Sequence, residues 1–90
     1  MCRNIRQLYN FEPPATTDEV RSAALQYVRK VSGSTKPSQA NQAAFDLAVR
    51  DVAAVARQLI DSLVTTSAPR DRAEWAARAK LRAAQRFARE

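Results

Sequence analysis

Histidine is absent from this chain, and cysteine occurs once, at position 2. One chain therefore cannot supply the four ligands of a closed Cys/His zinc site, and it cannot form a Cys–His pair or a Ser–His–Asp triad. No internal disulfide can form, and a lone cysteine is typical of a reducing compartment. We accordingly expect no catalytic residues, no closed metal site and no cofactor, and a non-enzymatic protein is favoured over an enzyme.

Long apolar runs are missing as well. No stretch of about 18 apolar residues could cross a bilayer, and no hydrophobic segment of a signal peptide follows the first arginines. These absences predict a cytoplasmic chain without a membrane partner.

Glycine is scarce, with one residue against four prolines, and this favours long uninterrupted elements. We expect one small domain over residues 1–90, with an N-terminal anchor segment in residues 1–15 and helices in residues 16–90. Of the 41 apolar residues 18 are alanines, so the core is expected to be small. Close helix packing through alanine, or burial against a second copy of the chain, would compensate.

Positive charge is concentrated near the C-terminus. The formal net charge is +6, and residues 70–90 hold seven Arg and Lys against three acidic residues. This asymmetry indicates a basic face and makes acidic partners, nucleic acid above all, the favoured ones. The alternative is a solvated helix whose polar positions happen to be arginine.

The expected fold is all-α, a compact three-helix bundle with a docked N-terminal segment. Helical spacing of apolar residues predicts helices near residues 16–32, 38–64 and 70–88. The predicted core residues are Tyr27, Val28, Phe45, Val52, Leu59 and Leu63. The outer side of the second helix offers two i,i+4 ion pairs, Asp46–Arg50 and Arg57–Asp61.

Capping signals support these helix bounds. Thr16 and Glu19 form a capping box at the first start, and Gly33 is a natural left-handed terminator. Asp71, or alternatively Ser67, is the expected cap of the third helix.

The anchor segment allows two conformations. Ile5, Leu8 and Tyr9 have the i, i+3, i+4 spacing of one or two helical turns. The prolines after Phe11 instead favour an extended stretch. Either way, docking of the segment would hold Cys2 in a fixed place.

Three stretches carry a resemblance: MCRNIRQLYNFEPPAT, EVRSAALQYVRKVSGSTKPSQANQAAFDLAV and LIDSLVTTSAPR. They resemble a family of short bacterial proteins, the domain of unknown function family 2277. The MCRNI start and the YVRKVSG…KPS block are its specific parts, and the resemblance covers about residues 1–72. It implies a small complete protein but no activity, cofactor or partner, so no functional residue is carried over from it.

Cys2 is the first candidate site, beside Arg3 and Arg6. Removal of Met1 would expose an aminothiol, and the two arginines would favour its thiolate. Such a group could chelate a soft metal, act as a nucleophile or be oxidised as a sensor. The alternative is that Cys2 is a small buried apolar residue at the start of the anchor segment.

The connection RKVSGSTKPS is the second candidate site. Hydroxyls, a glycine and cations gather there at a helix start, where free N–H groups attract anions. Its candidate phosphate-binding residues are Arg29, Lys30, Ser32, Gly33, Ser34, Thr35, Lys36 and Ser38. It is not a P-loop, since the glycine spacing is absent and no strand precedes it. The alternative is an ordinary sequence of helix cap, turn and helix cap.

Arg78, Arg82 and Arg86 follow at i,i+4 spacing in the third predicted helix and are further candidate phosphate-binding residues. The favoured function is a small basic interaction module that contacts the phosphates of a nucleic acid without reading its bases. Two alternatives stay open. One is a thiol, metal or redox site at Cys2, and the other is a helical protein–protein interaction module or homodimer.

Overall fold

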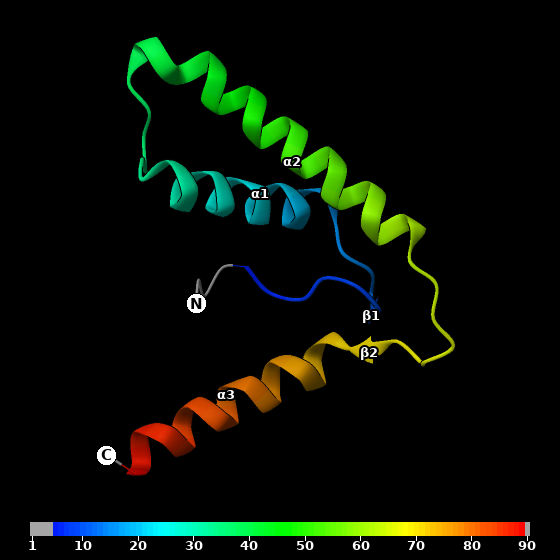
Figure 1. The fold of residues 1–90 in the computed structure, drawn as a ribbon. Coiled ribbons are helices and arrows are strands. Elements are labelled where there is room, and N and C mark those ends of the chain that lie inside the picture. The colour runs from blue at the N-terminus through cyan, green and yellow to red at the C-terminus, as the bar shows by residue number, and fades with distance from the viewer. Residues whose placement is uncertain (1–4, 90) are drawn as a thin grey trace.

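A computed structural model of the chain describes the backbone of residues 5–89 and the side chains of residues 5–86. It is mainly helical, as Figure 1 shows: α1 (Thr17–Ser32), α2 (Gln42–Ser62) and α3 (Arg72–Arg89). A short 3-10 turn, η1 (Gln39–Asn41), precedes α2, and two strands, β1 (Phe11–Glu12) and β2 (Arg70–Asp71), pair in parallel. The all-α class is confirmed. When η1 is counted with α2, each of the three helices begins and ends within two residues of its predicted bounds.

Local hydrogen bonds define the helix ends as predicted. The Thr16 N–H donates to Glu19 Oε1 over 3.1 Å and the Glu19 N–H donates to Thr16 Oγ1 over 3.2 Å, so the capping box is confirmed. Gly33 ends α1 with a φ of 70°, a conformation that costs glycine little. Asp71 Oδ1 accepts from the Glu74 N–H over 2.9 Å, which makes Asp71 the cap of α3.

The core lies between α1 and α2, which run antiparallel (Figure 1). Ala24 and Val28 of α1 and Val49 of α2 are buried in one cluster, against which Phe45 and Val52 are half-buried. The core placement of Val28, Phe45 and Val52 is therefore confirmed. Small side chains at the contact allow the two helices to approach closely.

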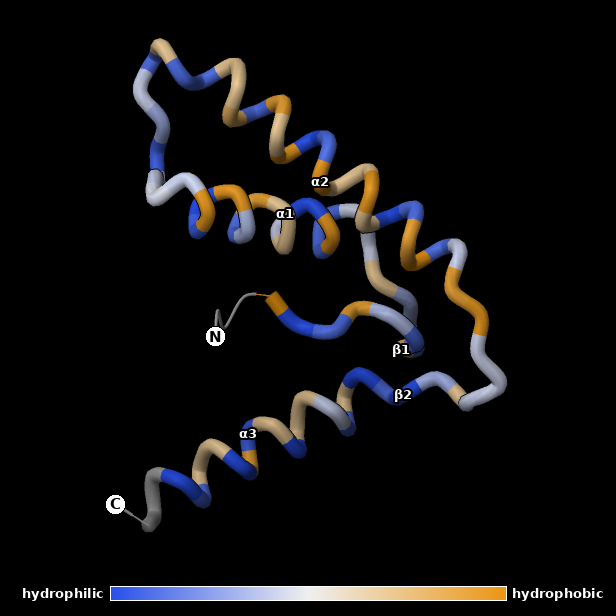
Figure 2. Tube along the Cα trace, in the orientation of Figure 1, coloured by the Kyte–Doolittle hydropathy of each residue, from blue (hydrophilic) through white to orange (hydrophobic). Residues whose placement is uncertain are grey.

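Three other predicted core residues are exposed, and that part of the prediction is wrong. Tyr27 is 49% exposed, Leu59 58% and Leu63 44%. The reason is that α3 does not cover the α1–α2 pair, so the flanks of both apolar stripes are left uncovered by the described residues. Figure 2 shows hydrophobic positions continuing along the last turns of α2, past the part that α1 covers.

One of the two ion pairs predicted on the outer side of α2 is present. Arg57 and Asp61 form the expected i,i+4 pair. Asp46 instead accepts from Gln42 Nε2 over 2.9 Å, and Arg50 lies 3.5 Å from Asp51. Gln42 lies four residues before Asp46, and Arg50 lies four residues after it. The Gln42 amide makes the hydrogen bond to the Asp46 carboxylate that Arg50 was expected to make.

The N-terminal segment joins α3 to the rest of the chain. Over the described residues it is extended rather than helical, so the helical turns predicted from Ile5, Leu8 and Tyr9 are wrong. Pairing of β1 with β2 keeps this part of the chain extended, and Phe11 of β1 is only 7% exposed. The Phe11 ring meets the Trp75 ring edge-on at 5.7 Å, which docks the segment on the first turn of α3.

The molecule is more open than the compact bundle expected from the sequence. Its Cα radius of gyration is 16.0 Å, whereas a compact chain of this length would have one of about 12 Å. The molecule extends 45 by 39 Å in two directions but only 16 Å in the third. Figure 1 shows α2, α1, the N-terminal segment and α3 spread across the wide plane.

Candidate phosphate-binding surface

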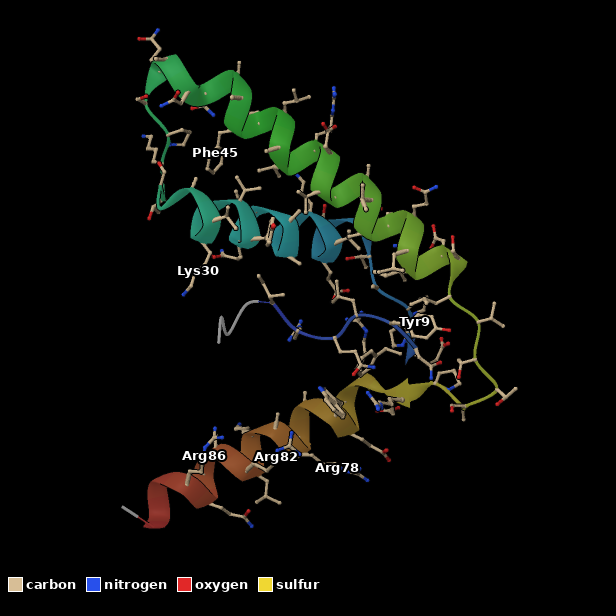
Figure 3. All side chains as sticks on the ribbon, viewed as in Figure 1. Tyr9, Lys30, Phe45, Arg78, Arg82 and Arg86 are labelled. Atoms are coloured by element: carbon tan, nitrogen blue, oxygen red, sulfur yellow. The ribbon has the colours of Figure 1, made fainter. Side chains whose placement is uncertain are left out.

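Arg78, Arg82 and Arg86 form an exposed row on α3, which we call the arginine row (Figure 3). The i,i+4 spacing keeps the three side chains on one side of the helix, about 6 Å apart along its axis. No acidic residue occurs between Glu74 and Glu90. Within the described part of the chain, none of the three forms an ion pair. The row therefore presents positive charge directly to solvent.

Trp75 orients one member of this row. The Arg82 guanidinium lies 5.9 Å from the centre of the Trp75 ring, and that of Arg70 lies 4.8 Å from it. Arginine over an aromatic face is held by cation–π attraction and keeps its N–H donors available at the edge of the plane. Arg82 is thus partly preorganised to contact two oxygens of one phosphate.

Arg72 holds the start of α3 to α1. Its Nη1 and Nη2 lie 2.8 and 2.7 Å from the two carboxylate oxygens of Glu19, and its Nε donates to the Pro13 carbonyl over 2.7 Å. This bidentate pair, with a further hydrogen bond from the Thr16 N–H, lowers the pKa of Glu19 from 4.5 to about 2. No sequence pattern singles out Arg72. The only local signal at its partner Glu19 is the capping box with Thr16, and Arg72 lies 53 positions away from Glu19.

Arg57 was also predicted only as a surface partner of Asp61. Its side chain is 35% exposed, and Nη1 donates over 3.2 Å to the carbonyl of Ala15, just before α1. The Arg57 hydrogen bonds lower the pKa of Asp61. Arg57 and Arg72 therefore serve the fold, and neither is free to bind a ligand.

The connection between α1 and α2 uses most of its polar groups internally. Arg29 Nε donates to the Thr35 carbonyl over 3.1 Å, so its guanidinium braces the loop. The Ser32 hydroxyl donates to the Arg29 carbonyl and accepts from the Ser34 N–H over 3.3 Å. Gly33 supplies the left-handed cap that lets the chain turn.

After Pro37, Ser38 has the sequence of a helix N-cap, but this interpretation is wrong. Ser38 makes no capping bond to the backbone, and its hydroxyl accepts from Asn41 Nδ2 over 3.1 Å. The 3-10 turn separates Ser38 from α2, which explains the missing cap. Of the charged groups in this connection, Lys30 and Lys36 are exposed, and Figure 3 shows Lys30 pointing away from α2.

The predicted candidates do not form one site. The connection lies at the end of the α1–α2 pair away from β1 and β2, whereas the arginine row lies on α3 (Figures 1 and 3). Among the hydrogen bonds and ion pairs of the described residues, none joins the two groups. The arginine row is thus a separate surface, and the connection is mainly a structural turn.

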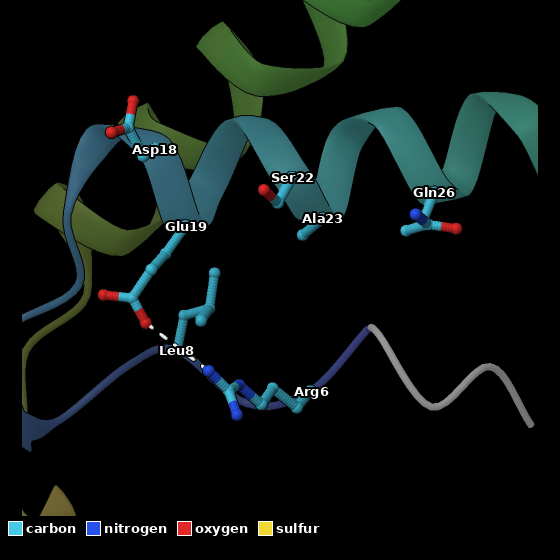
Figure 4. Close-up of a pocket in the computed structure, with 7 residues that line it drawn as sticks. All are labelled: Arg6, Leu8, Asp18, Glu19, Ser22, Ala23 and Gln26. Carbon is cyan, nitrogen blue, oxygen red and sulfur yellow. Dashed lines mark ion pairs between the residues drawn. The ribbon is translucent and has the colours of Figure 1, made fainter.

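Cys2 and Arg3 lie outside the described residues, so the thiol hypothesis stays a prediction. Arg6 is described: it is exposed and its Nη2 lies 3.7 Å from Glu19 Oε2, as the dashed line in Figure 4 marks. It borders an open hollow of about 430 Å³ between the anchor segment and α1. Across residues 5–89, no cluster of three or more His, Cys, Asp or Glu residues suited to a metal is present.

The comparisons with known proteins agree with the sequence resemblance. The sequence model of a family described as an uncharacterized conserved protein (DUF2277) matches residues 1–78. No curated protein and no solved structure matches the chain. The match ends at Arg78, so Arg82 and Arg86 lie beyond it. No helix in the described part of the chain has the length and apolarity needed to cross a membrane.

Proposed function

We propose that this chain, which belongs to the domain of unknown function family 2277, is a small non-enzymatic module that binds the phosphate backbone of nucleic acids through α3. The observation that carries the proposal is the arginine row, three exposed cations on one side of a helix that form no ion pair among the described residues. Guanidinium groups match phosphate oxygens in a bidentate way, and they are more weakly hydrated than ammonium groups.

The row favours phosphate contact over base reading. Arginine can also read guanine, but the only amide, hydroxyl or carboxylate side chain between Trp75 and Arg86 is Gln85, so no set of base-reading groups accompanies the row. Contacts of arginine to phosphate position a protein on nucleic acid without specifying sequence. We therefore expect little discrimination between sequences and a strong dependence on salt.

The proposal predicts the effect of removing the row. In an anisotropy titration at low salt with mixed-sequence DNA and RNA, the triple variant Arg78→Gln, Arg82→Gln, Arg86→Gln should bind far more weakly than the wild type. The slope of log K against log salt should fall by about two to three, because each lost phosphate contact removes nearly one unit.

A matched control removes the same charge outside the arginine row, with Arg21→Gln, Arg50→Gln and Lys80→Gln, all of which are exposed. This variant should keep most of the wild-type slope. Equal losses in both variants would mean that net charge alone drives binding. Absence of wild-type binding to either nucleic acid at low salt would refute the proposal.

A further inference from the structure

One face of α2, continued by its C-terminal cap residue Leu63, is apolar and largely exposed in the described chain, although its small member Ala48 also packs on the edge of the α1–α2 core. We call it the α2 face, and it consists of Ala44, Ala48, Val55, Leu59 and Leu63. At 100° per residue these positions fall on a stripe about 100° wide beside the residues that face α1. Val55 is 66% exposed and Leu59 58%, so the larger members lie in solvent in a single chain. No charged side chain belongs to this face.

The single chain also exposes far more surface than a compact monomer of the same mass would expose. Its accessible surface is 7421 Å², whereas a compact 10.0 kDa monomer would expose about 5,200 Å². The excess is therefore about 2,200 Å². Obligate homodimers bury about 1,000–2,500 Å² per subunit. The open chain therefore has room for a dimer interface, and the exposed Val55 and Leu59 contribute to its excess surface.

The flat shape leads to the same conclusion. Stable domains bury apolar faces between at least two packed layers of secondary structure. Here the elements are spread over 45 by 39 Å with a thickness of 16 Å, and the α1–α2 pair covers only one side of each helix. A second layer is needed to bury the α2 face, and this chain does not supply one.

We infer that a second copy of this chain supplies it, by packing its own α2 antiparallel against the α2 face across a two-fold axis. The face is complementary to itself. In that pairing the large Leu59 and Leu63 of one copy lie over the small Ala48 and Ala44 of the other, and Val55 lies near the axis. Helix α2 carries two arginines and three aspartates, so its net charge is −1 and the contact brings no strong like charges together.

A second copy fits better than an acidic or basic partner, because the α2 face has no charge with which to select one. This inference does not depend on the proposed function. In the dimer α3 stays outside the contact, and the two copies would present two arginine rows.

Sedimentation of the full chain from about 5 to 200 µM tests the inference. The wild type should sediment near 20 kDa, twice the 10.0 kDa of one chain. The double variant Val55→Glu, Leu59→Glu should sediment as a monomer with unchanged helical circular dichroism, because both residues are solvent-exposed in the single chain. A wild type that stays monomeric over the whole range would overturn the inference.

The matched control places the same two charges outside the α2 face, with Leu47→Glu and Leu81→Glu, which are 48% and 59% exposed. It should remain a dimer. Dissociation of this control with retention of the Val55→Glu, Leu59→Glu dimer would assign the contact to another surface and refute the inference.

Cross-linking gives a second test that does not require a destabilising charge. In a Cys2→Ser background, Val55→Cys should form a disulfide-linked dimer under mild oxidation. Asp46→Cys, which is exposed on another side of α2, should not. Equal cross-linking at both positions, or none at Val55→Cys, would contradict the antiparallel α2 contact.

Discussion

Glu19 contacts three parts of the chain, two of which lie outside its own helix. It closes the capping box with Thr16, binds Arg72 through both carboxylate oxygens and lies 3.7 Å from Arg6. One carboxylate therefore links the start of α1, the start of α3 and the anchor segment. The side chain is only 21% exposed, so water screens these interactions less than it would at an open surface.

The acid stability of the protein should depend on this carboxylate. Its pKa is about 2 in the folded chain, against 4.5 for the ordinary group. Because the folded-state pKa is the lower one, the stabilisation is complete above about pH 4.5 and is lost as the pH falls from there to about 2. Thermal unfolding of Glu19→Gln should show a lower melting temperature than the wild type at pH 7, and the difference should shrink toward pH 2.

Asp51→Asn is the control for this experiment, because Asp51 is an exposed carboxylate whose nearest cation, Arg50, is its sequence neighbour. Its melting temperature should follow the wild type across the same pH range. A Glu19→Gln variant that stays as far below the wild type at pH 2 as at pH 7 would show that the carboxylate charge is not the source of the stability.

At the scale of elements, the contacts of the described residues hold α3 at its first turns. Arg72 binds Glu19 and Pro13, Trp75 packs on Phe11, and β2 pairs with β1. From Ala76 to Arg82 every residue of α3 is exposed. Because most of the stability of a helix in a protein comes from tertiary packing, the order of α3 depends on these contacts at one end.

Trp75→Ala should therefore loosen α3 without unfolding the α1–α2 pair. In hydrogen exchange, protection of amides in α3 should fall by at least about tenfold, because local opening becomes easier when a packed aromatic contact is lost. Amides of α1 around Val28 should keep wild-type protection. Leu81→Ala, which removes an exposed side chain of α3, is the control and should change neither region. A uniform loss of protection in Trp75→Ala would mean that α3 and the pair unfold as one unit.

At the scale of the whole molecule, the chain is basic and unusually extended for its length. Its net charge is +6, with the excess on the segment that contains α3, and its radius of gyration is 16.0 Å. Positive charge on an outlying helix disfavours its collapse onto the rest of a basic chain, and it favours encounter with an anionic polymer. The positive charge of α3 is therefore one reason for the extended shape of the chain.

Small-angle scattering on the monomeric Val55→Glu, Leu59→Glu variant should give a radius of gyration near 16 Å. A compact chain of 90 residues would give about 12 Å. A value close to the compact one would show that α3 folds back onto the α1–α2 pair in solution. The same measurement at high salt separates the two causes. A radius that stays near 16 Å shows that the contacts of Arg72 and Trp75 set the position of α3, and a fall toward about 12 Å shows that charge repulsion does.

The helices and most of their ends could be predicted from the sequence. The Thr16–Glu19 box, the Gly33 terminator and the Asp71 cap all act within three or four residues of the chain. Their chemistry therefore does not depend on what the rest of the molecule does. The basic character of the segment that becomes α3 is likewise a property of the sequence.

What only the tertiary structure decided is which of these elements meet. Glu19 and Arg72 are separated by 53 positions, and no local pattern pairs them. The exposure of Leu59 follows from the position of α3, although its place in an apolar stripe predicts a core residue. The arginine row is exposed and separate from the α1–α2 connection for the same reason. A helical stripe specifies that a face is apolar, whereas the packing of distant elements determines whether that face is covered within one chain.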